Sequence, residues 1–136
     1  MDKNVFQWPI RVYWEDTDAG GIVFYANHLK FFERARTEWL RSLGIGQQQL
    51  KETTGGMFVV AETSVRYLRP ARLDDELTVT ASLKQSGRAS MTILQQVLLE
   101  NSVLCEGTIR IGWVDASSMR AARIPQAITK RLRVST

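Results

Sequence analysis

The chain has 136 residues, of which 44% are hydrophobic, and its formal net charge is +4 at pH 7. A chain of this length folds as one domain, residues 1–136, and buries roughly two thirds of its unfolded surface. No apolar run approaches the ~20 residues that span a bilayer, and the N-terminus lacks the charged and apolar regions of a secretory signal. We therefore expect a cytoplasmic domain with no transmembrane segment.

The scarcity of sulfur and imidazole side chains excludes several kinds of site. Cys105 is the only cysteine and His28 the only histidine, so an intrachain disulfide and a zinc site of nitrogen and sulfur ligands are both ruled out. No Gly-x-Ser-x-Gly motif is present, which argues against the nucleophile elbow of a serine hydrolase. Cys105 lies in an alternating apolar run and is expected to pack. The composition favours carboxylate chemistry without a metal or other cofactor.

In chain order, a strand is predicted over about Val5 to Tyr13, and an acidic loop with two glycines, residues 15–21, follows it. Because glycine has no Cβ, Gly20 and Gly21 let the chain turn sharply and let a ligand approach the backbone. Asp16 is interpreted as an acceptor that stabilises this loop.

A helix is predicted next, from about Leu29 to Leu43, because its apolar residues recur within an arc of roughly half the circumference. Gly44 supplies its C-terminal stop. So wide an apolar face predicts that the helix is covered on more than one side. Arg36 projects into the apolar arc and needs an acceptor, which Glu33 can supply at i−3. The alternative is that Glu33 lines the site as a second carboxylate.

Beyond a short turn or helix at 47–51 and a break at Gly55-Gly56, the hydrophobic period changes to two. Strands are predicted over 58–69, 77–84, 91–99 and 103–113, with turn residues between them. One long helix followed by a run of antiparallel strands is an α+β arrangement, in which a sheet packs on the helix.

The acidic loop and the helix start together supply two groups that acyl transfer needs. The first N–H groups of a helix have no intrahelical partner and carry partial positive charge, so they stabilise an oxygen that gains charge. Asp18 lies within a few residues of those donors near Tyr25, and it can attack a carbonyl or activate water. On spacing alone, the commoner role is a helix cap, for which Asp18 or Asn27 is suitable.

Several motifs carry a family resemblance. They are Trp8-Pro9-Ile10-Arg11-Val12-Tyr13, Glu15-Asp16-Thr17-Asp18-Ala19-Gly20-Gly21-Ile22-Val23, Phe32-Glu33-Arg34-Ala35-Arg36-Thr37-Glu38, Arg66-Tyr67 and Pro70-Ala71-Arg72-Leu73-Asp74-Asp75. Together they resemble the hotdog-fold acyl-coenzyme A thioesterases of the 4-hydroxybenzoyl-coenzyme A thioesterase type, and most closely the subgroup associated with the Tol-Pal system. The likeness covers most of the chain, and the motif around Asp18 is its most specific part.

The resemblance implies a hotdog fold, in which a sheet of about five strands wraps around one long helix. It also implies active sites between the subunits of a homotetramer, with Asp18 as the catalytic carboxylate and the Tyr25 N–H polarising the thioester carbonyl. The chain departs from the subgroup pattern, which has histidine at position 25 and tyrosine at position 28. A chemical role for a histidine side chain at position 25 is therefore in doubt, whereas a backbone donor survives the change.

The resemblance also implies that the segment from Lys84 to Ser90 contacts the nucleotide phosphates of coenzyme A (CoA). Arg88 and Ser90 are the candidate phosphate ligands, Arg120 is a further one, and Gly20 and Gly21 border the substrate. The positive charge fits these phosphates, the acidic surface of an acyl carrier protein or a solvated surface. Because the charges are dispersed, nucleic acid is not expected as a partner.

Three functions stay open at this level. The first is hydrolysis of acyl-CoA thioesters to the free acid and CoA, in lipid metabolism. The second is dehydration by a hotdog enzyme that uses His28. The third is noncatalytic binding of acyl-CoA or acyl carrier protein by a scaffold of an envelope-maintenance complex, peripheral to the inner membrane. Acyl chain preference cannot be read from the sequence.

Overall fold

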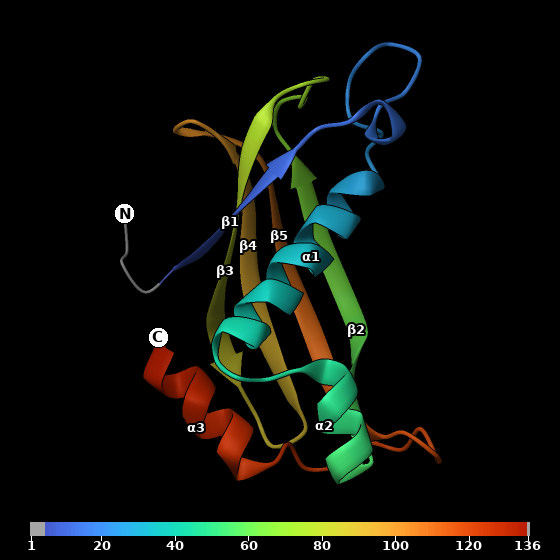
Figure 1. The fold of residues 1–136 in the computed structure, drawn as a ribbon, viewed down its shortest axis with the longest axis vertical. Coiled ribbons are helices and arrows are strands. Elements are labelled where there is room, and N and C mark those ends of the chain that lie inside the picture. Colours follow the sequence, from blue (N-terminus) through green and yellow to red (C-terminus); the bar gives the residue numbers. More distant parts are fainter. Residues whose placement is uncertain (1–4, 136) are drawn as a thin grey trace.

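The computed structural model describes residues 5–135. Its five strands form one antiparallel sheet in the order β1-β3-β4-β5-β2, with the long helix α1 lying across one face (Figure 1). The strands are β1 (Phe6–Arg11), β2 (Gly56–Tyr67), β3 (Glu76–Ser86), β4 (Ser90–Leu99) and β5 (Ser102–Asp115). The predicted α+β class and the predicted strands are confirmed.

The helices are α1 (Asn27–Ser42), α2 (Gln47–Thr54) and α3 (Gln126–Ser135), and a short 3-10 turn covers Trp14–Asp16. The predicted end of α1 is confirmed, because Gly44 has φ 78° and the Ile45 N–H donates to the Leu40 carbonyl at 2.9 Å. Helix α3 was not predicted. Within residues 5–135, the structure contains no helix that has both the length and the apolarity to cross a membrane.

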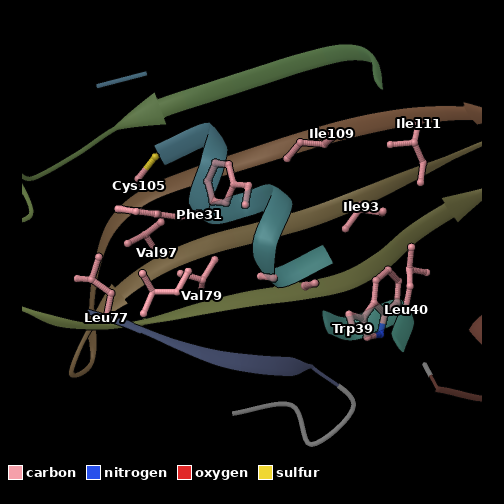
Figure 2. Close-up of a cluster of buried hydrophobic side chains, with 14 of the residues drawn as sticks. Phe31, Trp39, Leu40, Leu77, Val79, Ile93, Val97, Cys105, Ile109 and Ile111 are labelled. Carbon is pink, nitrogen blue, oxygen red and sulfur yellow. The ribbon is translucent and has the colours of Figure 1, made fainter. Parts of the chain in front are cut away.

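The core lies between α1 and the facing side of the sheet. Buried side chains of α1, among them Phe31, Phe32 and Leu40, meet alternate residues of β3, β4 and β5. Figure 2 shows Phe31 in one cluster with Val97 and Cys105. Burial raises the pKa of the Cys105 thiol to about 12, with Glu106 adding to the effect, so the prediction that Cys105 packs is confirmed.

One side of α1 is uncovered in the single chain. The helix packs on β1, β3 and β4, whereas β2 is an edge strand with a β-bulge between Val60 and Glu62. Val60 is 55% exposed, Tyr67 47% and Leu29 of α1 42%. The predicted cover on more than one side of α1 is therefore incomplete in this chain, and the open side faces β2.

A glycine on β5 leaves room for a buried side chain of α1. A Cβ at Gly107 would lie 2.8 Å from Cε2 of the buried Phe32. We expect Gly107→Ala to lower the free energy of unfolding by about 1–3 kcal/mol, because the core cannot accommodate the added methyl group without shifting.

Urea unfolding of Gly107→Ala measures this loss, and Gly112→Ala on the same strand is the matched control. A Cβ at Gly112 meets nothing closer than the Ala89 carbonyl oxygen at 3.8 Å. Equal stabilities for the two variants would contradict the expectation.

Candidate active site

Asp18 lies at the tip of a small hairpin formed by residues 17–23. The Asp18 N–H donates to the Ile22 carbonyl at 2.8 Å, and the Gly21 N–H donates to the Asp18 carbonyl at 3.0 Å. The Val23 N–H donates to the Ala71 carbonyl at 2.8 Å, which ties the hairpin to the β2–β3 connection. Backbone bonds therefore hold the carboxylate at a defined and exposed position.

The two glycines shape this hairpin tip. The Gly20 N–H donates to Asp18 Oδ1 at 2.8 Å, and a Cβ at Gly20 would lie 3.3 Å from the same oxygen. Gly21 has φ 78°, which favours glycine. Both N–H groups are engaged within the hairpin, so contact of Gly20 or Gly21 with a substrate stays a prediction. Within residues 5–135, Asp18 Oδ2 has no hydrogen-bond partner, so it is open to a ligand.

Asp16 joins the loop to the start of α1. Its side chain is 6% exposed and accepts the Tyr13 N–H at 2.8 Å, while its carbonyl accepts the Phe24 N–H and the Asn27 side-chain amide, both at 2.9 Å. The prediction that Asp16 stabilises the loop is confirmed. These bonds bring the residues just before α1 back alongside the segment that carries Asp18.

The start of α1 has no side-chain cap. Its cap residue is Ala26, and the two predicted caps are engaged elsewhere, Asp18 with Gly20 and Asn27 with the Asp16 carbonyl. Capping is therefore not the role of either side chain. In the described part of the chain, the N–H groups of Tyr25 and Ala26 have no acceptor. They lie at the positive end of a 16-residue helix, beside the Asp18 hairpin.

Aromatic side chains surround this helix start. Tyr25 is 63% exposed, and its ring meets that of Tyr67 edge-on, with the centroids 6.0 Å apart. His28 is 3% exposed, packs against Tyr67 and Phe31, and its Nδ1 has no partner among residues 5–135. Dehydration by His28 needs an imidazole that reaches the substrate, and this burial works against it.

The tertiary structure also reveals a contact for which the sequence offers no local signal. The Tyr67 hydroxyl, at the end of β2, donates to the Tyr25 carbonyl at 3.0 Å. The alternation of β2 puts Tyr67 on one face with Val65 and Thr63, but it does not indicate which segment this face meets.

The predicted ion pair of Glu33 with Arg36 is wrong. The Arg36 guanidinium donates to Gln95 Oε1 of β4 at 2.9 Å, and Glu33 accepts the Thr37 hydroxyl at 2.6 Å. The reason is that the sheet side of α1 offers Arg36 a buried acceptor, while Thr37 is next to Glu33 at i+4. Burial lowers the pKa of Arg36, and the charge of Glu33 opposes this. Glu33 and Arg36 line a cavity of about 220 Å³ between α1 and β2.

The candidate phosphate ligands lie far from Asp18 within one chain. Arg88 and Ser90 are at the β3–β4 turn, and Arg120 follows β5. The Asp18 hairpin lies at the opposite end of the sheet, beside the start of β3 (Figure 1). Because β3 has 11 residues, the two ends are roughly 35 Å apart. The bonds of Asp16 place the Asp18 hairpin next to the residues that precede α1, whereas Arg88 lies at the far end of the sheet.

Charge is also divided between these two ends. Glu15 and Asp74 line one cavity beside the Asp18 loop. Arg11 also lines this cavity, but its charge is paired with Glu76. At the other end, residues 116–135 contain five Lys or Arg residues and no Asp or Glu. No ion pair is found within residues 5–135 for four exposed cations there, Arg88, Arg120, Arg123 and Lys130. These cations attract an anionic group to this end of the sheet.

Comparisons with known proteins show the family of the chain. Residues 12–132 match the family model described as the thioesterase-like superfamily. The acyl-CoA thioesterase YbgC of Haemophilus influenzae is 39% identical over 128 residues, which cover 94% of each chain. The acyl-CoA thioester hydrolase YbgC of Escherichia coli O157:H7 is 40% identical over 129 residues, 94% of this chain and 96% of that protein.

Solved structures lead to the same family. A probable thioesterase from Bartonella henselae superposes with a TM-score of 0.84 at 30% identity, over 89% of this chain and 99% of that one. A 1,4-dihydroxy-2-naphthoyl-CoA thioesterase from Synechocystis, at 20% identity, shares the fold with a TM-score of 0.87 over 95% and 96% of the two chains. The fold and these relatives define a hotdog thioester hydrolase. The chain belongs to the thioesterase-like superfamily, and the predicted family and hotdog fold are confirmed.

The buried His28 generates a prediction on stability. Burial lowers the pKa of its imidazole below the ordinary value of 6.5. Below about pH 6.5 the unfolded chain then binds more protons than the folded chain. The free energy of unfolding therefore has its full value above that pH and decreases as the pH is lowered. We expect His28→Phe to lose this part of the pH dependence, because His28 is the only histidine.

Urea unfolding at several pH values between about 7.5 and 5.5 checks this expectation, since carboxylates titrate mainly below this range. Parallel pH profiles for the wild-type protein and His28→Phe would contradict it.

Proposed function

We propose that this protein hydrolyses acyl-CoA thioesters to the free acid and CoA, with Asp18 as the catalytic carboxylate and the unpaired N–H groups at the start of α1 as the oxyanion site. The observation that carries the proposal is the pairing of a carboxylate that has a free oxygen with an uncapped helix start beside it. The names of the YbgC relatives support the same chemistry.

The chemistry follows from where charge develops. The thioester carbonyl oxygen points to the Tyr25 N–H, which stabilises the negative charge of the tetrahedral intermediate. Asp18 either attacks the carbonyl carbon, so that the C–S bond breaks and water later cleaves the mixed anhydride, or it takes a proton from the attacking water. In both routes CoA leaves as the thiolate, and one water is consumed for each free acid that is released.

We further propose that the CoA phosphates bind at the basic end of a second copy of the chain. Arg88, Ser90 and Arg120 are too far from Asp18 to act on one substrate within a single chain. The edge strand β2 is exposed over much of its length, and a copy added antiparallel across this edge brings its basic end toward Asp18. Such a pair buries the open side of α1, and two pairs form the proposed homotetramer.

Finer parts of the proposal concern location and partners. We propose a cytoplasmic enzyme of lipid metabolism, associated peripherally with the Tol-Pal envelope-maintenance complex. The exposed cations beyond β5 also suit the acidic surface of an acyl carrier protein, which is the alternative acyl donor.

We expect Asp18→Asn to lower kcat by about 10²–10⁴, the range for loss of a catalytic acid or base. Release of free thiol from acyl-CoA substrates of short, long and aromatic acyl groups measures this, with a chromogenic thiol reagent. Glu15→Gln is the matched control, because Glu15 is an exposed carboxylate of the same loop whose side chain has no partner among residues 5–135.

Asp18→Asn with undiminished turnover would remove Asp18 from the mechanism. Hydrolysis that requires His28 and not Asp18 would favour the chemistry of the dehydratase alternative, and binding of acyl-CoA without any turnover would favour the scaffold alternative.

The shared site predicts complementation between two defective variants. Arg88→Ala removes a charge-assisted hydrogen bond to phosphate, which contributes about 1.5–3 kcal/mol to binding. We therefore expect this variant to raise the KM for acyl-CoA roughly tenfold or more. When Asp18→Asn and Arg88→Ala subunits are mixed under conditions of subunit exchange, one site of each mixed pair combines an intact Asp18 with an intact Arg88.

Activity at low substrate concentration is therefore expected to exceed the mean of the two variants measured alone. A mixture whose activity is only the mean of the two would contradict the shared site. It would show either that Asp18 and Arg88 of one chain act in the same site or that Arg88 does not bind the substrate.

A further inference from the structure

Tyr67 makes a long-range bond to the start of α1. It is the last residue of β2, its partner across the sheet is Cys105 of β5, and its hydroxyl donates to the Tyr25 carbonyl at 3.0 Å, across 42 residues of sequence. Its ring also meets those of Tyr25 and His28 edge-on. The end of β2 thus holds Tyr25, the residue whose backbone N–H faces the proposed oxyanion.

An oxyanion site at a helix start has two conflicting requirements. Its N–H groups have to stay unpaired, and yet the first turn has to be held in place so that the donors point to the substrate. An ordinary cap side chain fixes the turn by accepting one of those N–H groups, which removes a donor. Helix α1 has Ala26 at this position and no side-chain cap.

The first turn is instead held through its carbonyl groups. The Phe24 carbonyl accepts the Asn27 N–H at 2.8 Å, and the Tyr25 carbonyl accepts the His28 N–H at 3.3 Å. The second of these bonds is longer than the usual 2.9–3.0 Å, and the Tyr67 hydroxyl adds a shorter bond to the same oxygen. Tyr67 therefore restrains the part of the turn that the helix itself holds least well.

The same bonds also polarise the donors. The Tyr25 N–H shares its peptide group with the Phe24 carbonyl, and the Ala26 N–H shares its peptide group with the Tyr25 carbonyl. A carbonyl that accepts a hydrogen bond makes the N–H of its own amide a stronger donor. Both unpaired N–H groups belong to amides whose carbonyls accept hydrogen bonds, and the Tyr67 hydroxyl strengthens this effect for the Ala26 N–H.

We infer that Tyr67 is a positioning residue of the thioesterase site, which fixes and polarises the start of α1 through the Tyr25 carbonyl and leaves the Tyr25 and Ala26 N–H groups free for the oxyanion. The inference rests on the proposed function. Tyr67 suits this task because its phenol is a donor: burial, followed by smaller effects of Cys105 and Tyr25, raises the pKa of its hydroxyl, so the donor proton is retained at neutral pH.

The test removes one hydroxyl group. We expect Tyr67→Phe to lower kcat about tenfold, less than the ~10²–10³ lost when an oxyanion donor itself is removed, with KM unchanged within about twofold. Tyr13→Phe is the matched control, because Tyr13 is an exposed tyrosine near the same loop and its hydroxyl makes no bond to the Tyr25 carbonyl. A wild-type kcat in Tyr67→Phe, or a loss confined to KM, would overturn the inference.

A second measurement does not depend on turnover. In ¹⁵N-labelled protein, Tyr67→Phe is expected to shift the amide proton resonance of Ala26 upfield, because the Tyr25 carbonyl of the same amide loses a hydrogen bond, whereas Tyr13→Phe leaves it in place. An unshifted resonance would contradict the inference. Failure of the proposed function is distinguishable, because it appears in the wild-type protein as absent hydrolysis or in Asp18→Asn as retained hydrolysis.

Discussion

The proposed chemistry depends on two backbone N–H groups at the start of α1 that have no acceptor in the described part of the chain. A helix start normally gives such groups a capping side chain, and the candidates for that task are present nearby. Asn27 instead reaches back to the Asp16 carbonyl, and Asp18 bonds to Gly20. Because both side chains are engaged elsewhere, the positive end of the helix stays open toward a ligand.

The neighbouring hairpin meets the second requirement, which is a carboxylate whose position does not depend on the substrate. Backbone bonds at residues 18–23 define the turn, and a further bond to Ala71 joins it to the sheet. The buried Asp16 links this hairpin to the residues before α1. A preorganised pair of base and donors needs little of the substrate's binding energy for ordering, so that energy stays available for the transition state.

The division of charge along the molecule complements this site. In the proposal, the phosphates of CoA bind at the end with Arg88 and Arg120, whose positive charge attracts them. Because the length of β3 separates this end from Asp18, the proposed site needs a second chain to complete it. The exposed edge of β2 and the uncovered side of α1 are surfaces that a second copy can bury, and a two-fold arrangement completes two sites at once. The edge strand, the open helix side and the charge separation thus have a common explanation in the proposed assembly.

The sequence by itself determined the fold class, the extent of α1 and of the strands, the stop at Gly44 and the motif around Asp18, because hydrophobic period and glycine conformation are local properties. Helix α3 escaped prediction: it has ten residues, and so short a helix depends on burying side chains such as Ile128 and Leu132 against the rest of the protein. Only the tertiary structure decided that Arg36 bonds to Gln95, that Tyr67 holds the Tyr25 carbonyl, and that Arg88 lies at the far end from Asp18. Each of these depends on which distant segments meet, and periodicity along the chain does not contain that information.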